Sequence, residues 1–251
     1  MRVISVTNHK GGVGKTTSTV NIAAALNMLG KKILLIDLDP QAQLTYSVGI
    51  KDHEQRNSIY EFIKGDLKFN EVVINQDNID VIPSSLNLSG ADIELSSIAG
   101  RERLLSHALN GVDGYDFILL DCPPSLGLLT LNALTASKEI FIPIQPEFLA
   151  LQGMSKLIRF VDVVIERLNK DLQITGIIIT RYNKRRKLNN EVIEKIKEYF
   201  ENKIFKTPIR ENISLAEAPS FGQSIFQYNA KSHGAEDYLN LSKEIMERGE
   251  I

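Results

Sequence analysis

The sequence contains a single cysteine, Cys122, and no tryptophan. One thiol cannot form a disulfide or a cysteine-rich zinc site within the chain, so folds that depend on either are excluded. With four histidines, a His-rich metal centre is also disfavoured. No stretch approaches the roughly 20 apolar residues of a membrane helix, and the start, MRVISVTNHKGG, has too short an apolar run for a signal peptide. We therefore expect a soluble, cytoplasmic protein.

An excess of positive charge is also lacking. The chain has 29 Lys and Arg against 31 Asp and Glu, a net charge of −2. This balance argues against a protein that is basic all over, as DNA-coating proteins are. Hydrophobic residues make up 43% of the chain, which is enough to fill a core. The length of 251 residues, without a repeat or a Pro/Gly-rich linker, leads us to expect one domain over residues 1–251.

Short β-branched, apolar segments alternate with helical patterns. Most of these segments are apolar throughout, which is typical of strands covered on both faces of a parallel sheet. The expected strands are Val3–Thr7, Ile33–Leu38, Ile79–Pro83, Phe117–Asp121, Ile140–Ile144 and Ile174–Thr180. Helices are expected near Lys15–Leu29, Gly90–Leu109, Leu126–Ala136, Leu149–Asn169, Asn189–Phe200 and Ala235–Glu247. The alternation predicts an α/β fold with a doubly wound, mostly parallel sheet and helices on both faces; Lys51–Asn78 is less regular.

The segment KGGVGKTT, residues 10–17, follows the first expected strand and opens the first helix, which is the context of a phosphate-binding loop (P-loop). Its glycines allow a tight turn that brings amide N–H groups to phosphate oxygens. Lys15 would contact the β- and γ-phosphates, and the Thr16 hydroxyl would bind Mg²⁺. The usual first glycine is replaced by His9, and a second lysine precedes the glycines. The candidate nucleotide-binding residues are Lys10, Gly11, Gly12, Val13, Gly14, Lys15, Thr16 and Thr17.

Aspartates end two of the expected strands. Asp37 and Asp39 lie in LLIDLDPQ, and Asp121 ends the strand of FILLDCPPS. The carboxyl ends of parallel strands share the edge of the sheet at which open α/β folds bind ligands, and the P-loop lies at the same edge. Thr16, Asp37 and Asp121 are therefore candidates for holding Mg²⁺, in part through water. Asp39, just beyond its strand, is the candidate for orienting the water that attacks the phosphate.

These motifs resemble the ParA/Soj group of chromosome- and plasmid-partitioning ATPases, within the larger ParA/MinD class with a deviant P-loop. The resemblance spans nearly the whole chain in KGGVGKTT, DLDPQAQ, FILLDCPPSLG, IPIQPEFLALQG and ENISLAEAPSFGQSI. It implies ATP and Mg²⁺ as cofactors, and catalytic roles for Lys10, Lys15 and Asp39. Arg210 and Asn212 match a segment near the nucleotide base, although residues 209–212 read Ile-Arg-Glu-Asn where a common family form has Ile-Pro-Arg-Asn.

The same resemblance implies partners. Lys10 matches a signature lysine that, in such proteins, reaches the ATP of the second subunit, which implies an ATP-sandwich homodimer. Relatives bind double-stranded DNA without sequence preference when they are dimeric and ATP-bound, and a centromere-bound ParB-like protein accelerates their slow hydrolysis. We therefore expect a nucleoid-associated ATPase that segregates chromosome or plasmid DNA.

A local basic segment lies within the near-neutral chain. Residues 181–210 contain ten Lys or Arg and four Glu, a net charge of +6, which leaves −8 for the rest. Non-specific DNA affinity grows with the number of phosphate contacts, so a dimer presenting this segment twice would bind more tightly than a monomer. The candidate DNA-binding residues are Arg181, Lys184, Arg185, Arg186 and Lys187. An ordinary solvated basic surface is the alternative interpretation.

Three other functions compete with this one. A MinD-like membrane ATPase would carry a basic amphipathic C-terminal helix. Residues 235–251 have two basic and five acidic residues, so no membrane partner is expected. An iron–sulfur ATPase like nitrogenase reductase needs more than the lone Cys122 for a bridging cluster, and cobyrinate-type enzymes share the superfamily. A ParA-like positioner of another cargo remains open, because the partner selects the cargo.

Overall fold

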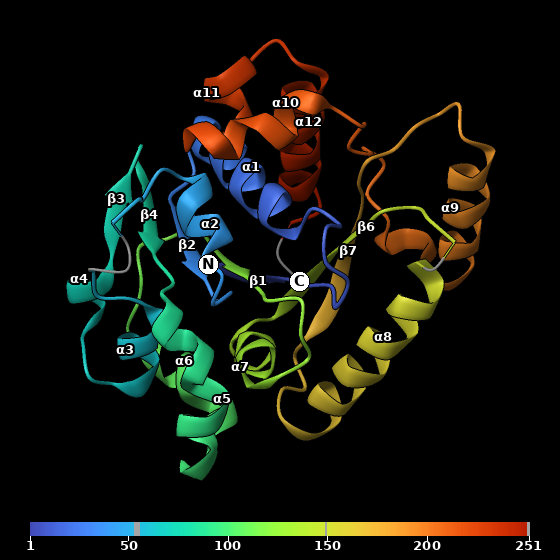
Figure 1. Ribbon diagram of the computed structural model, residues 1–251. Helices are drawn as coiled ribbons and strands as arrows, with labels where there is room; N and C mark the ends of the chain where they lie inside the picture. The colour runs from blue at the N-terminus through green and yellow to red at the C-terminus, as the bar shows by residue number, and fades with distance from the viewer. Residues whose placement is uncertain (53–55, 149, 250–251) are drawn as a thin grey trace.

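The computed structural model describes residues 1–52, 56–148 and 150–249. One sheet with the order β3-β4-β2-β5-β1-β6-β7 runs through it, and helices lie on both sides (Figure 1). Among the described strands, the edge strand β3 pairs antiparallel with β4, and the other pairings are parallel. The predicted fold class is confirmed. The strands are β1 Arg2–Val6, β2 Ile33–Asp37, β3 Ile74–Gln76, β4 Ile79–Ile82, β5 Phe117–Asp121, β6 Glu139–Ile144 and β7 Gln173–Ile179.

The helices vary widely in length. The longer ones are α1 Lys15–Met28, α7 Leu128–Ala136, α8 Ala150–Arg167, α9 Lys187–Phe200 and α12 His233–Glu247. Shorter ones are α2 Gln43–Ser47, α3 Ile59–Lys64, α4 Phe69–Val72, α5 Ala91–Glu94, α6 Leu104–Ala108, α10 Ile213–Glu217 and α11 Ile225–Asn229. Short 3₁₀ turns are η2 Leu86–Gly90, η3 Leu95–Ser97, η4 Arg101–Arg103, η5 Glu201–Lys203 and η6 Ala218–Phe221.

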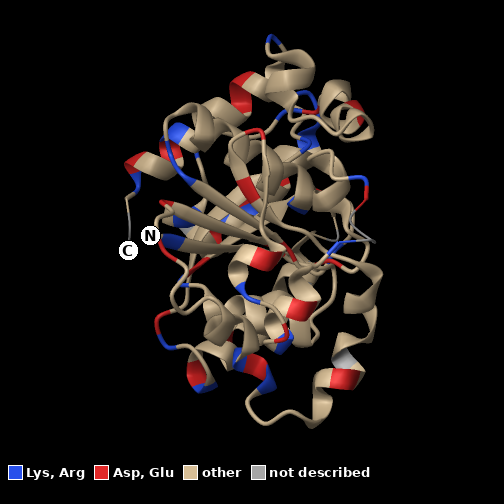
Figure 2. Ribbon diagram, turned by 90° about the vertical axis from the view of Figure 1, so that its left-hand side faces the viewer, with Lys and Arg blue, Asp and Glu red and all other residues tan. Residues whose placement is uncertain are grey.

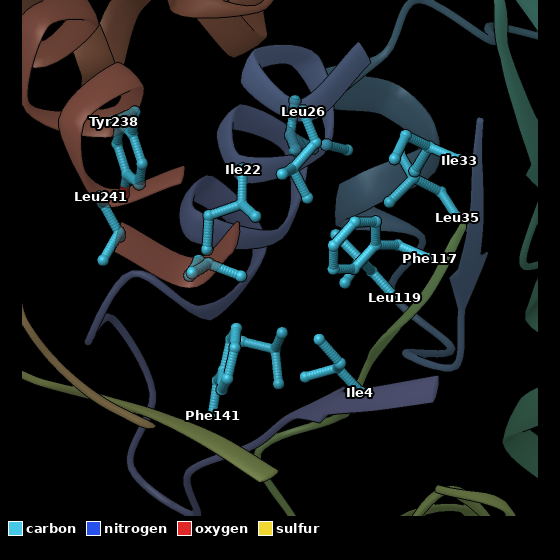
Figure 3. Packing of buried hydrophobic residues seen from close by; sticks show 14 of the residues in the cluster. Ile4, Ile22, Leu26, Ile33, Leu35, Phe117, Leu119, Phe141, Tyr238 and Leu241 are labelled. Atoms are coloured by element: carbon cyan, nitrogen blue, oxygen red, sulfur yellow. The ribbon is translucent and has the colours of Figure 1, made fainter. Parts of the chain in front are cut away.

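The core on one face of the sheet joins the two ends of the chain. Ile22 and Leu26 of α1 and Tyr238 and Leu241 of α12 turn toward side chains of the central strands, such as Phe141 (Figure 3). All of these side chains are buried. Each Å² of apolar surface removed from water contributes roughly 25 cal/mol of favourable free energy, and this contribution is the main one that holds such layers together. Helix α12 is therefore part of the core, and its apolar side is covered by α1.

The predicted helix at Gly90–Leu109 is wrong as a continuous element. The structure breaks it into η2, α5, η3, η4 and α6. Gly100 adopts a left-handed φ of 73°, which glycine tolerates and which interrupts a right-handed helix. The other long predicted helices are present with shifted ends. Leu149, the predicted first residue of α8, lies outside the described residues.

The topology gathers the ends of the parallel strands at one edge. Strand β1 lies between β5 and β6, and β2 lies on the far side of β5. Register places Val6 beside Asp121, and Asp121 beside Asp37. Open α/β sheets bind ligands outside these carboxyl ends, next to the point where the strand order reverses. The segments that follow β1, β2, β5, β6 and β7 therefore surround one site.

Candidate functional site

The loop between β1 and α1 is shaped by glycine. Gly12 and Gly14 have φ values of 73° and 89°, and Gly14 caps the N-terminus of α1. L-residues with a Cβ rarely adopt this left-handed conformation, so glycine is strongly favoured at both positions. The loop ends on a 14-residue helix. The free N–H groups and partial positive charge of this helix end favour a bound anion, as a phosphate-binding loop requires.

Some of the other residues of the loop are exposed, and others are buried and anchor the loop. Gly11 and Gly12 are exposed, whereas Val13 is buried and Thr17 is half-buried. The Val13 carbonyl accepts a hydrogen bond of 2.8 Å from Oγ1 of Thr180, which directly follows β7. The loop is thus anchored by β1, which it follows, and by the residue after β7. Its glycine-rich side is left open for a ligand.

Lys15 is an ammonium group inside the protein. It is 8% exposed, and its Nζ donates to the Lys10 carbonyl oxygen at 3.3 Å. Burial lowers the Lys15 pKa, because desolvation penalises the charged form, and the charges of Asp121 and Asp39 oppose that shift. A negative ligand on the loop would compensate the buried positive charge. This arrangement suits the phosphate contact predicted for Lys15.

Asp121 is hydrogen-bonded to the first turns of α1. Its Oδ2 accepts from Thr16 Oγ1 at 2.6 Å, and its Oδ1 accepts from Thr19 Oγ1 at 3.3 Å. Burial, and secondly the neighbouring Asp37, raise the Asp121 pKa to about 8. An unneutralised carboxylate is costly at this position, so a cation would be favoured. The pairing of Thr16 with Asp121 brings together two of the three predicted Mg²⁺ ligands.

Asp37 is hydrogen-bonded to α2. Its Oδ2 accepts from the amide and the hydroxyl of Thr45, at 2.9 and 2.7 Å. Its Oδ1 accepts from the Asp39 amide at 3.1 Å. Burial raises the Asp37 pKa to about 6. Within the described residues, no group of three or more His, Cys, Asp and Glu could hold a metal ion. A magnesium ion here would therefore rely on Thr16, a carboxylate, and phosphate and water oxygens, as Mg²⁺ commonly does.

Asp39 projects beyond the end of β2. It is half-buried, and its Oδ1 accepts from the Gln41 amide at 2.9 Å. This local turn fixes the carboxylate at the carboxyl edge of the sheet, one strand away from Asp121. The negative charge of Asp39 opposes the lowering of the Lys15 pKa, so the carboxylate lies near the loop.

Lys10 is paired within its own chain. Its Nζ donates to Glu147 Oε2 at 2.7 Å, and both side chains are substantially exposed, at 36% and 46%. Glu147 follows β6, next to Phe148, whose side chain is 76% exposed. Glu147 was not among the site residues predicted from the sequence. Its position after an apolar strand, within the family-like stretch IPIQPEFLALQG, is the signal that could have identified it.

A cavity of about 340 Å³ opens beside the loop. Its walls include Gly12, Gly14, Thr17, Thr180, Arg181, Glu211, Asn212 and Tyr238. Asn212 Oδ1 is buried and has no hydrogen-bond partner within the described residues. A buried acceptor without a donor costs free energy, so a ligand N–H here would be favoured. Asn212 thus lines the same cavity as Gly12, Gly14 and Thr17 of the loop.

Arg210 points elsewhere. It donates to both carboxylate oxygens of Asp237 and, at 2.6 Å, to Glu236. Asp237, and then Glu236, raise the Arg210 pKa. Arg210 is not among the described residues that line the cavity. The structure therefore places this candidate base contact on α12, where it ties the segment before α10 to the core.

Comparison with known proteins agrees with this geometry. A family model described as an AAA domain matches residues 1–174. The protein is 45% identical over 251 residues to the sporulation initiation inhibitor protein Soj of Bacillus subtilis, which covers 99% of each chain. It is 41% identical over 250 residues to the chromosome partitioning protein ParA of Myxococcus xanthus, covering 98% of this chain and 88% of the other. The chain belongs to the ParA/Soj family of partitioning ATPases. The predicted resemblance is confirmed.

The ParA/Soj fold is shared with solved P-loop structures. Cobyrinic acid a,c-diamide synthase from Mycobacterium smegmatis, solved with a bound ATP analogue and magnesium, superposes with a TM-score of 0.87 at 34% identity. The match covers 99% of this chain and 95% of the other. Nucleotide and Mg²⁺ binding are therefore features of this group of folds. None of the described helices is long and apolar enough to cross a membrane.

The basic segment of this ParA/Soj chain forms an exposed loop that follows β7 and ends on Lys187, the first residue of α9. Arg181, Lys184, Arg185, Arg186 and Lys187 are all exposed. Two of them approach one carboxylate: Arg186 lies 3.2 Å and Arg181 4.0 Å from oxygens of Glu211. No function was predicted for Glu211 from the sequence. On the face that carries β3, β4 and α3, acidic and basic residues are mixed (Figure 2).

Proposed function

We propose that this protein is an Mg²⁺-dependent partitioning ATPase. In this proposal residues 1–251 form one ATPase domain that dimerises around two ATP molecules. The dimer binds double-stranded DNA without reading its sequence, on the nucleoid in the cytoplasm. A ParB-like partner then stimulates hydrolysis, and the cycle segregates chromosome or plasmid DNA. The main support is the joint placement of a glycine-shaped loop, a buried Lys15 and strand-end carboxylates at one edge.

The chain's own residues divide the work at this site. The loop amides and Lys15 bind the phosphates, and Asn212 offers a hydrogen-bond acceptor for the amino group of adenine. Thr16 and Asp121 would hold Mg²⁺, with Asp37 behind them. The ion would neutralise negative charge on the transferred phosphoryl group. Asp39 would orient the attacking water from the open side.

Lys10 is the residue that would complete the active site of the second subunit in a dimer. Two triphosphates facing each other bring large negative charge to an interface, so each subunit must supply cations across it. Lys10 lies at the exposed rim, held by a partly exposed ion pair with Glu147. Such pairs contribute about 0–1 kcal/mol, so a triphosphate can displace Glu147 at little cost. The exposed Phe148 beside this pair would be covered in the dimer.

The experiment that tests the proposal compares Lys10→Ala with the wild-type protein in analytical ultracentrifugation, with and without Mg²⁺–ATP. We expect Lys10→Ala to keep nucleotide binding but to lose the ATP-dependent dimer, because its positive charge is missing from the interface. Lys31→Ala, on the loop before β2, is the matched control and should dimerise normally. An unimpaired ATP-bound dimer of Lys10→Ala would contradict the sandwich arrangement.

Corrinoid amidation is the second candidate, because cobyrinic acid a,c-diamide synthase is the function of a structure 34% identical to this chain. Partitioning is favoured by the higher identities to Soj and ParA, 45% and 41%. The two functions differ in their response to DNA. Stimulation of ATP turnover by DNA together with a ParB-like protein supports partitioning, whereas turnover that depends on a corrinoid acid supports amidation.

A further inference from the structure

Glu211 lies opposite the basic loop because the main chain holds the two segments together. The Tyr182 amide donates to the Ile209 carbonyl at 2.9 Å, and the Glu211 amide donates to the Tyr182 carbonyl at 3.1 Å. Tyr182 and Arg210 form an isolated parallel bridge. The side chain of Glu211 therefore has a fixed origin beside residues 181–186. Its position is set by these main-chain hydrogen bonds and not only by contacts between mobile side chains.

Two arginines of that loop converge on the Glu211 carboxylate. Arg186 Nη2 lies 3.2 Å from Oε2, and Arg181 Nη2 lies 4.0 Å from Oε1. The Glu211 side chain is 40% exposed, that of Arg181 is 56% exposed and that of Arg186 is 54% exposed. Lys184, Arg185 and Lys187 form no ion pair within the part of the chain that the structure describes. The carboxylate thus engages two of the five basic residues of the loop.

The loop itself is ordered by side-chain hydrogen bonds. The Asn183 amide donates to Asn189 Oδ1, and the Arg185 amide donates to Asn183 Oδ1, both at 3.0 Å. The Arg186 amide donates to the Asn183 carbonyl, also at 3.0 Å. Arg181 adopts a left-handed φ of 48°, which is uncommon for a residue with a side chain. The guanidinium groups are therefore presented from a defined backbone, so Glu211 acts on a preformed basic surface.

We propose that Glu211 is a built-in charge brake on DNA binding. It occupies Arg181 and Arg186 and places a negative charge among the phosphate-binding groups, so DNA must compete for both arginines. This inference rests on the proposed DNA-binding function and deepens it. The brake lowers the affinity of the loop for DNA, and its carboxylate also lines the cavity beside the P-loop.

The strength of the brake follows from its exposure. Ion pairs between half-exposed side chains are weak and are screened by salt, so phosphates can displace Glu211. Removing the carboxylate should therefore change affinity several-fold and not by orders of magnitude. Each arginine freed to contact a phosphate should steepen the plot of log affinity against log salt by about 0.9. The slope separates new phosphate contacts from a general change in charge.

The test measures binding of a random-sequence DNA duplex to the full chain over a salt titration, with Mg²⁺ and a non-hydrolysable ATP analogue at a concentration that saturates each variant, because Glu211 lines the cavity beside the P-loop. Glu211→Gln should bind at least threefold more tightly near 100 mM salt and show a steeper slope, by about 0.9 to 1.8 per subunit. Glu191→Gln removes the same charge from the first turns of α9. No ion pair of Glu191 occurs within the described residues, so this control should leave the slope unchanged.

A double-mutant cycle tests whether Glu211 acts through Arg186. If Glu211 acts through Arg186, the gain from Glu211→Gln should shrink in an Arg186→Ala background. Equal behaviour of Glu211→Gln and Glu191→Gln would overturn the brake while DNA binding itself stands. DNA binding absent from the wild type and from Glu211→Gln at low salt would overturn the proposed function and the brake with it. Binding by Glu211→Gln alone would support the brake in its strongest form.

Discussion

Among single residues, the buried carboxylate of Asp121 carries the clearest pH signature. Its pKa is raised to about 8, above the ordinary value of an aspartate, because burial disfavours the charged form. Between about pH 4 and pH 8, the Asp121 carboxyl is therefore protonated in the folded state but ionised in the unfolded state. The contribution of Asp121 to stability is therefore most favourable at low pH, and it declines as the pH rises toward its folded pKa.

We expect the melting temperature of the nucleotide-free protein to fall between about pH 5 and pH 8, and Asp121→Asn to remove much of that fall. Calorimetry at several pH values without Mg²⁺ provides the measurement. Asp113→Asn, at an exposed site, is the control and should keep the wild-type slope. The same slope in Asp121→Asn as in the wild type would show that this carboxylate does not titrate as its burial requires.

Asp39 makes a different prediction, because its proposed role is in the reaction and not in the fold. Asp39→Ala should bind ATP and dimerise but turn over at least about 100-fold more slowly, the usual loss when a group that directs proton transfer is removed. Single-turnover hydrolysis measures this directly. The variant should also remain on DNA in the presence of ATP, whereas Gln41→Ala, in the same turn, should turn over normally. An unchanged rate in Asp39→Ala would refute its assignment.

At the scale of elements, the attachment of β7 depends on a buried glycine. A Cβ at Gly176 would lie 2.7 Å from the Phe141 ring and would collide with Phe205. The two rings meet edge to face with centroids 5.2 Å apart, and the Arg248 guanidinium covers Phe205. Gly176 therefore makes room for the aromatic pair that joins β6, β7 and the segment after η5.

Gly176→Ala should destabilise the protein by about 1–3 kcal/mol, as overpacking of a filled core does. Chemical denaturation measures the change in the free energy of unfolding. Combining it with Phe205→Leu should recover part of the loss beyond the sum of the single effects, because the smaller side chain admits the methyl group. Stabilisation by Gly176→Ala, as expected at an uncrowded strand position, would contradict the packing seen here.

The elements also show which features a sequence can predict. The apolar strands were identified within one or two residues, because strands buried on both faces have a continuous apolar signal. The short β3 was missed, although Asp77 and Asn78 between β3 and β4 have positive φ and suit a two-residue hairpin. The P-loop and strand-end aspartates follow from local motifs. The pairs Lys10–Glu147 and Arg186–Glu211 depend on tertiary geometry, which no local pattern encodes.

For the whole molecule, the net charge of −2 averages two unlike surfaces. The loop before α9 is basic and exposed, at the β7 end of the sheet (Figure 1). Charges of both signs are mixed over the face at the opposite end (Figure 2). DNA binding by this protein would thus be directional, because one end of the sheet presents the cations. A dimer that presents this end twice would add its phosphate contacts, which links ATP binding to DNA affinity through mass action.

Replacing Lys184 and Lys187 with glutamate tests this distribution. ATP-dependent DNA affinity should fall at least tenfold, and the slope of log affinity against log salt should become shallower by about 0.9 for each phosphate that the loop no longer neutralises. The matched control replaces Lys31 and Lys32, which precede β2 at the other edge of the strands, and changes the net charge equally. Since overall charge is the same in the two variants, only position distinguishes them. Equal falls in affinity, or affinity independent of salt, would show that DNA does not meet this loop.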